Sequence, residues 1–137
     1  MKNEKELVDM TDSEKNNKLF SCLEECEESC LSTIMHSLAE ESVVVTMEAM
    51  VNLMDCEQIC SLTRKFILRD SDYAGDIVEL CACICEACAK NCRSFHNDEA
   101  MHDCAEVCEN CAMACREIIQ ECAETTSEKK LAQSRTI

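Results

Sequence analysis

The chain has 137 residues, no Pro, a single Gly and fifteen Cys, and its formal net charge is −15. The length suits one domain with one core, and the near absence of Gly and Pro favours long helices over turn-rich folds. The acidity argues against nucleic acid or an anionic membrane as a partner, and no apolar run reaches transmembrane length.

We predict a single all-α domain over residues 1–137, an antiparallel four-helix bundle with a thiol-lined core. The first helix is expected over about 12–39, because Thr11 and Glu14 form a capping-box pattern. A second helix is expected over about 42–69, with Ser42 as its cap. The clearest loop is Asp70–Asp76, which contains Gly75, the only glycine.

A third helix is predicted over about 76–95, starting at Asp76. The sequence His96-Asn97-Asp98 then makes a tight turn, and Asn97 or Asp98 caps a fourth helix over about 98–126. The polar stretch 127–137 is expected to fray at the end of the chain.

Fourteen of the cysteines recur at steps of three, four or seven residues within these helices. In the fourth helix this spacing keeps five thiols within roughly 60° of arc, at positions that normally face a bundle core. Cys packs as a small hydrophobe, but fourteen in register would fill a core poorly. His96 extends the third-helix stripe if that helix lasts long enough. The predicted metal ligands are Cys22, Cys26, Cys30, Cys56, Cys60, Cys81, Cys85, Cys88, Cys92, Cys104, Cys108, Cys111, Cys115, Cys122 and His96.

Metal binding suits this spacing better than disulfides do. The Cβ atoms of residues i and i+4 lie about 5 to 6 Å apart, whereas a disulfide needs roughly 3.5 to 4.5 Å. Soft thiolates select copper(I), zinc or iron–sulfur clusters. Zinc held by four thiolates leaves a charge of −2 in a dry core, whereas copper(I) that shares its thiolates gives a neutral array. We therefore predict storage of on the order of 14 copper(I) ions.

The run 85–115, CEACAKNCRSFHNDEAMHDCAEVCENCAMAC, closely resembles the bacterial copper storage proteins, which are cysteine-rich four-helix bundles. The close match covers about residues 81–122. The resemblance implies a homotetramer of bundles packed with copper(I) thiolates and no enzymatic activity. No export signal is visible at the start of the chain, which favours the cytosolic form of the family. The ligand role carries over to Cys85, Cys88, Cys92, Cys104, Cys108, Cys111 and Cys115.

Two other functions stay open: a metallothionein-like buffer for zinc or cadmium, and a redox protein acting through its thiols. The zinc buffer would bind only about three or four ions. Cys81 is the nearest redox candidate, but the carboxylates of Asp76 and Glu79 would raise its pKa. No Ser/His/Asp set, phosphate loop or HExxH pattern is present, so the chain is not expected to be a conventional enzyme.

Several cysteines, methionines and histidines lie outside the stripes. Cys83 points about 200° away from Cys81. A packed or half-exposed thiol without a role is favoured over one that sits at a subunit interface or binds copper outside the bundle. His36 and His102 are expected at the surface or at helix ends. The methionines are expected to pack, in the core or an oligomer interface for Met47, Met50 and Met54 and as gap-fillers for Met35, Met101 and Met113.

Overall fold

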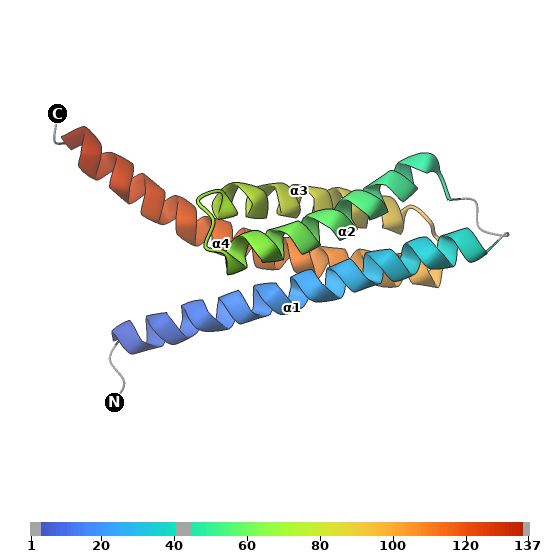
Figure 1. Ribbon diagram of the computed structural model, residues 1–137, viewed down its shortest axis with the longest axis horizontal. Coiled ribbons are helices and arrows are strands. Elements are labelled where there is room, and N and C mark those ends of the chain that lie inside the picture. Colours follow the sequence, from blue (N-terminus) through green and yellow to red (C-terminus); the bar gives the residue numbers. More distant parts are fainter. Residues whose placement is uncertain (1–3, 41–44, 136–137) are drawn as a thin grey trace.

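The computed structural model describes the backbone of residues 4–40 and 45–135 and the side chains of residues 14–40 and 45–120. Its four helices are α1 (Glu4–Ala39), α2 (Met47–Leu68), α3 (Ala74–Arg93) and α4 (Glu99–Arg135). They lie together as an antiparallel bundle, and no strand occurs in these two ranges (Figure 1). The predicted all-α bundle is confirmed.

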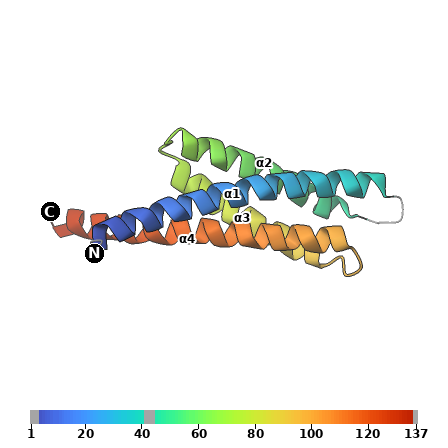
Figure 2. The same cartoon turned by 90° about the horizontal axis from the view of Figure 1, so that it is seen from below.

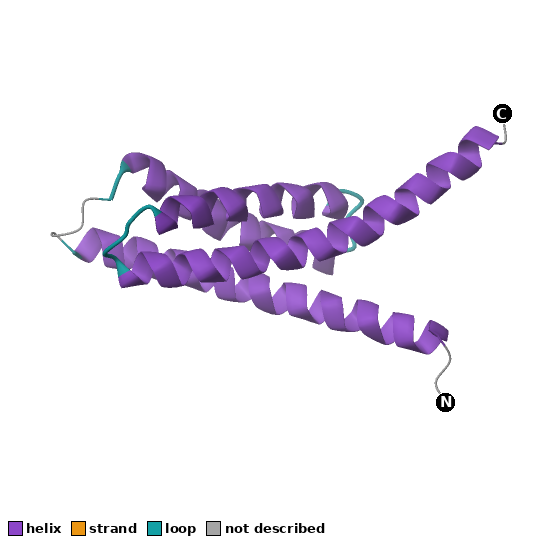
Figure 3. Ribbon diagram, turned by 180° about the vertical axis from the view of Figure 1, so that it is seen from behind, coloured by secondary structure: helices purple, strands orange, loops and turns teal. Residues whose placement is uncertain are grey.

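The four helices occupy the corners of a square. α1 packs against α2 and α4, and α3 packs against the same two helices, while the diagonal pairs bring no described Cα atoms within 8 Å of each other. The centre of the square is therefore shared by side chains from all four helices. We call the end of the bundle that holds the turn 94–98 the turn end, and the opposite end, toward the two chain termini, the terminal end (Figure 3).

The outer helices are longer than predicted. α1 begins at Glu4 rather than near Asp12, and α4 continues to Arg135 rather than ending near Thr126. Both extend beyond α2 and α3 at the terminal end (Figures 1 and 2). Neither extension contains Gly or Pro, so nothing in the sequence stops the helix once it has started. The expected fraying of the stretch 127–137 is corrected to a helical backbone as far as Arg135.

Side-chain caps begin α2 and α4. The Thr46 hydroxyl accepts a hydrogen bond from the backbone N–H of Ala49 at 3.2 Å, so α2 begins at Met47. The expected cap of this helix, Ser42, lies outside the described residues. Asp98 Oδ1 accepts from the Met101 N–H at 3.1 Å, which confirms Asp98 as the cap of α4. Each cap satisfies a backbone donor that the first helical turn leaves without a partner.

The connection between α2 and α3 turns at Asp70 rather than at the glycine. Asp70 has a φ of 53°, in the left-handed region that a short polar side chain tolerates. Gly75 instead lies in the first turn of α3, which begins at Ala74 and not at Asp76. α3 ends at Arg93, two residues before the predicted limit, because Ser94 already belongs to the turn.

The buried interior consists of Cys and Ala with a few larger side chains. Leu19 and Leu23 are fully buried toward the terminal end, and Leu53 and Met101 are fully buried toward the turn end. Carboxylates such as Glu24 lie on the outside, as predicted. Within the described part of the chain, no helix carries an apolar stretch that could span a bilayer.

Ion pairs join neighbouring helices across the surface. Arg93 and Arg116 of α3 and α4 each hold a glutamate of the other helix, Glu109 and Glu86, through two N–H donors. Further pairs join Arg64 to Glu27 at 3.5 Å and Lys18 to Glu117 at 3.4 Å. Exposed pairs of this kind contribute little to stability, so the core holds the bundle together.

Candidate metal centre

The fourteen cysteines that recur at helical spacing are called the stripe thiols, and the thirteen whose side chains are described lie around one shared interior. Steps of three and four residues bring each thiol back to the same helical face, and in this bundle that face points to the shared centre. Twelve of the thirteen are no more than 1% exposed: Cys26, Cys30, Cys56, Cys60, Cys81, Cys85, Cys88, Cys92, Cys104, Cys108, Cys111 and Cys115. Cys22 is partly exposed, and the side chain of Cys122 lies outside the described residues.

Sulfur atoms from different helices touch one another. Cys26 Sγ of α1 lies 3.6 Å from Cys56 Sγ of α2, which lies 3.7 Å from Cys85 Sγ of α3. Between α1 and α4, Cys30 Sγ lies 3.8 Å from the sulfurs of both Cys104 and Cys108. The sulfurs therefore form a connected network that runs through the core.

Thiols along one helix also approach each other without bonding. The Sγ atoms of Cys81 and Cys85 are 3.9 Å apart, and those of Cys104 and Cys108 are 4.0 Å apart. A disulfide would require about 2.05 Å. Every cysteine whose side chain the structure describes is free. The core thus offers thiols rather than cross-links.

The core contains three groups of four thiols. Within each group, all four sulfur atoms lie within 4.8 Å of one another, and neighbouring groups share two members. Cys26 and Cys56 belong to the first and second groups, and Cys60 and Cys85 belong to the second and third. Cys30 and Cys108 complete the first group, and Cys81 and Cys111 complete the third. Two thiolates around a metal with bonds near 2.3 Å lie about 3.8 Å apart in a tetrahedral site, and this spacing recurs throughout the array.

Burial opposes the charged thiolate form of the core thiols. Hydrogen bonding with Cys104 and Cys108, followed by burial, raises the pKa of Cys30 above the ordinary thiol value. The thiols of Cys111 and Cys26, again with burial, raise the pKa of Cys60 and of Cys85 in the same way. These thiols are therefore protonated at neutral pH, so they pack as small apolar groups and must lose a proton to bind a metal.

His96 does not extend the third-helix stripe. α3 ends at Arg93, and His96 lies exposed in the turn that follows it. The stripe of buried ligands on this helix ends at Cys92, and a ligand role for His96 stays a prediction. His36 is exposed as predicted. His102 is half-buried, and its Nε2 atom is buried without a hydrogen-bond partner.

Most of the methionines whose side chains the structure describes are not buried in the bundle. Met47 is 84% exposed and Met54 is 45% exposed, on the face of α2 opposite Cys56, so the expectation of core packing is wrong for them. Met35 and Met113 are also exposed rather than filling gaps, whereas Met101 is fully buried as predicted. The oligomer-interface alternative for the methionines of α2 stays a prediction.

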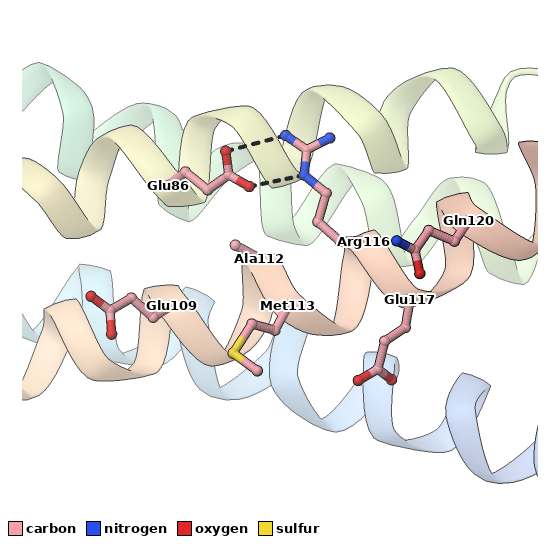
Figure 4. A pocket seen from close by; sticks show the side chains of 7 residues that line it. All are labelled: Glu86, Glu109, Ala112, Met113, Arg116, Glu117 and Gln120. Atoms are coloured by element: carbon pink, nitrogen blue, oxygen red, sulfur yellow. Dashed lines mark hydrogen bonds and ion pairs between the residues drawn. The ribbon is translucent and has the colours of Figure 1, made fainter.

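Cys83 lies outside the array, on the exposed side of α3. An Arg116 N–H donates to its Sγ at 3.5 Å, and the same guanidinium holds Glu86 (Figure 4). Arg116 and Glu86 also line a surface pocket between α3 and α4. Cys83 thus contacts Arg116 on the surface and lies apart from the buried metal centre.

Hydroxyl side chains continue two of the thiol stripes, a feature that sequence reasoning missed. Thr33 follows Cys30 by three residues and Thr63 follows Cys60 by three, so the same spacing that singled out the thiols would have found both. The Thr33 hydroxyl donates to the Ser29 carbonyl at 2.7 Å, as helical threonines commonly do. Thr63 is fully buried, and its Oγ1 atom has no partner.

Comparisons with known proteins agree with this arrangement. The family of copper storage proteins matches residues 12–120. A relative from Bacillus subtilis (strain 168), the uncharacterized cysteine-rich protein YhjQ, is 34% identical over 82 residues, which cover 57% of this chain and 75% of the relative.

Two solved structures are similar to the whole bundle. The copper(I)-bound copper storage protein BsCsp3 has a TM-score of 0.69 and 28% identity, covering 75% of this chain and 96% of its own. A cytosolic copper storage protein from Streptomyces lividans, with five coppers, has a TM-score of 0.74 and 26% identity, covering 80% of this chain and 96% of its own. Because the family match spans most of the chain and the fold agrees with that of these bundles, the chain belongs to the copper storage protein family.

Proposed function

We propose that the chain stores copper(I) ions, several in each bundle, as thiolate complexes along its core. The observation that carries this proposal is the sharing of thiols between neighbouring groups of four, through Cys26 and Cys56 and again through Cys60 and Cys85. A bridging thiolate binds two metal ions at once, so shared sulfurs allow one continuous array. Both the family and the copper-loaded relatives support this function.

Charge favours copper(I) over zinc for filling the whole core. A zinc ion with four thiolates carries a net charge of −2, and each further site adds to that charge in a water-free interior. One copper(I) ion per bridging thiolate leaves no net charge. The thirteen described stripe thiols, together with Cys122, supply the ligands predicted from the sequence.

A zinc buffer remains the second candidate, on one specific observation. The first and third groups of four thiols have no member in common, so two tetrahedral zinc sites fit the array at the same time. The middle group would then have no thiols left to bind a third ion. A zinc buffer based on these groups would therefore saturate at two ions.

Storage explains the core better than catalysis or redox chemistry does. Cys81, the redox candidate, is fully buried and touches the sulfurs of Cys60 and Cys85 rather than solvent. A redox-active thiol needs access to its partner protein or small-molecule thiol. We therefore propose a non-catalytic role, and we propose that it is carried out in the cytosol, where thiols stay reduced.

We also propose that the bundles assemble, as homotetramers on the family resemblance. The last turns of α1 and the first turns of α2 carry an exposed apolar face made by Leu31, Met35, Leu38, Met47, Val51 and Met54. From Leu31 to Ala39 the sequence contains no Asp, Glu, Lys or Arg, although the chain is strongly acidic. A contiguous apolar face on a soluble protein is typical of an interface.

The test is a titration of the reduced protein with copper(I) and, separately, with zinc, counting the ions bound per chain. More than about ten copper(I) ions, with the helical circular dichroism unchanged, is the result expected for a shared array. Saturation at two to four ions of either metal would instead indicate separate tetrathiolate sites and would reject copper storage in favour of the zinc buffer.

A further inference from the structure

Buried side chains cover the described stripe thiols at both ends of the bundle. Toward the turn end, Leu53 and Met101 lie beyond the last thiols of α2 and α4, and both are fully buried. Toward the terminal end, Leu19 and Val78 occupy the equivalent positions on α1 and α3 and are 2% exposed. A surface pocket at the turn end is lined by His36 and carboxylates and contains no thiol. The described stripe thiols at the two ends, apart from Cys22, are therefore shielded from solvent.

Cys22 is the exception among the described stripe thiols, because it is partly exposed. It lies four residues before Cys26, so it belongs to the same face of α1 as the array. Side chains of both charges act electrostatically on its thiol, namely the cation Lys18 and the carboxylates Glu25 and Glu117. Glu117 belongs to α4, so Cys22 lies on the side of α1 that faces α4.

An ion pair crosses the surface at this place. Lys18 Nζ of α1 lies 3.4 Å from Glu117 Oε1 of α4, and the two side chains are 55% and 39% exposed. Glu117 extends from α4 toward α1 (Figure 4). We call the surface formed by Lys18, Cys22 and Glu117 the α1/α4 seam. An exposed pair contributes little to stability, so this pair can break without loss of the fold.

Burial is the largest influence on Cys22 and raises its pKa, while the Lys18 ammonium opposes this shift. The Lys18 ammonium thus offsets part of the negative charge that Glu25 and Glu117 place beside the thiol. Partial exposure distinguishes Cys22 from the other described stripe thiols.

We propose that Cys22 is the first protein ligand of incoming copper(I), which is delivered by a small-thiol complex through the α1/α4 seam. In this step a bond forms between copper and Cys22 Sγ while the bond to one carrier thiolate breaks. The Cys22 proton leaves on the departing carrier as a free thiol. Copper stays in its +1 state throughout, so no oxidant or reductant takes part.

The array behind Cys22 can distribute the ion by the same exchange. Cys26 is one helical turn away, and its sulfur lies 3.6 Å from Cys56 Sγ and 3.8 Å from Cys108 Sγ. From there, contacts of 3.7 Å to Cys85 and 3.8 Å to Cys30 lead toward the two ends of the core. Each transfer then replaces one thiolate by its neighbour while the ion remains bound.

Chemical labelling of the metal-free wild-type chain tests the accessibility. The reduced protein is treated briefly with iodoacetamide, and the order in which cysteines react is read by mass spectrometry. Cys83, exposed and off the stripes, and Cys22 are expected to react before the twelve buried thiols. Labelling of Cys92 or Cys104, at the turn end, as fast as Cys22 would overturn the proposal.

Loading kinetics test the role itself, which rests on the proposed storage function. The copper(I) complex of glutathione is mixed with the wild type and with the Cys22→Ala and Cys83→Ala variants, after each is shown to be helical. Cys83 is the control because it is an exposed thiol that lies outside the array. Loading of Cys22→Ala should be about tenfold slower, since access then requires local opening of the bundle. Cys83→Ala should load at the wild-type rate.

The final amount of bound copper separates the two hypotheses. If the wild type fills its core, storage holds, and equal loading rates for Cys22→Ala and Cys83→Ala would reject Cys22 as the first ligand. If the wild type binds no more than two to four ions, the storage function fails and the inference falls with it. A slow Cys22→Ala variant that still reaches nearly the wild-type copper content supports both.

Discussion

The sulfur atoms of Cys26 and Cys56 lie 3.6 Å apart, although thirty residues separate the two in the chain. They come from α1 and α2, and both belong to two of the three four-thiol groups. A thiol shared by two groups can bridge two metal ions, whereas a thiol at the edge of the array has fewer sulfur neighbours. The position of a cysteine in the array should therefore determine how many copper(I) ions the chain fails to bind when that cysteine is replaced.

Replacing Cys26 by Ala should lower the copper(I) content more than replacing Cys92, which belongs to none of the three groups. We expect a loss of about two ions for Cys26→Ala and about one for Cys92→Ala, since a central thiolate bridges two metals. Mass spectrometry of the copper-saturated chains under non-denaturing conditions gives the count. Equal losses for both variants would mean that the thiols act independently rather than as a shared array.

The interior face of each helix could be predicted from the sequence because spacing alone determines it. Steps such as Cys104, Cys108 and Cys111 return to one side of any straight helix, whatever packs against it. The sharing of thiols between groups could not be predicted in this way. This sharing depends on the position of each helix relative to its neighbours along the bundle axis. The packing of side chains such as Leu53 and Met101 determines that position.

Helix ends were the weaker part of the prediction. His96 was expected to extend a stripe, but α3 stops at Arg93, and nothing in the periodicity reports that end. Glu4 and Arg135 lie beyond the predicted limits because neither terminal stretch contains a Gly or Pro to stop the helix. Met47 was placed opposite the thiols by its spacing, and its exposure follows from there being no further helix on that side.

Thr63 offers a test of the balance between polar and apolar groups in the core. Its buried Oγ1 atom has no hydrogen-bond partner, which costs free energy in the metal-free protein. Replacing it with Val keeps the shape and removes the unsatisfied hydroxyl, so the free energy of unfolding should rise by about 1 kcal/mol. Urea denaturation of the metal-free chain measures this change.

Thr33→Val is the matched control for that substitution. The Thr33 hydroxyl is also buried but donates to the Ser29 carbonyl at 2.7 Å. Its loss therefore removes a hydrogen bond, whereas the loss of the Thr63 hydroxyl removes an unsatisfied polar group. We expect no gain in stability, or a loss of up to about 1 kcal/mol. A loss of stability in Thr63→Val as large as that in Thr33→Val would show that the Thr63 hydroxyl is satisfied in solution.

The exposed apolar face of α1 and α2 predicts a second behaviour, assembly through that face. Leu38→Glu places a charge at a side chain that is 68% exposed, so the fold should survive while assembly is lost. Leu80→Glu is the control, because Leu80 is 52% exposed on α3, away from this face. Light scattering after gel filtration reports the mass. A wild-type monomer, or equal dissociation of both variants, would exclude this face as the interface.

The raised thiol pKa values predict that the metal-free bundle loses stability in alkali. Hydrogen bonding with neighbouring thiols and then burial raise the pKa of Cys30, Cys60 and Cys85 in the folded chain, whereas the unfolded chain titrates near an ordinary thiol pKa of about 8.5. Above that pH the unfolded state gives up protons that the folded state keeps. The stabilisation is therefore complete below about pH 8.5 and falls as the pH rises, by about 1.4 kcal/mol per pH unit for each such thiol.

Urea denaturation of the reduced, metal-free chain between about pH 7 and 10 measures this slope, which several buried thiols should make steep. Cys30→Ser should make it shallower, whatever its effect on the stability at pH 7, because one thiol that ionises only after unfolding has been removed. A stability that stays constant across this range would mean that Cys30, Cys60 and Cys85 ionise within the folded bundle, and their protonated state would have to be abandoned.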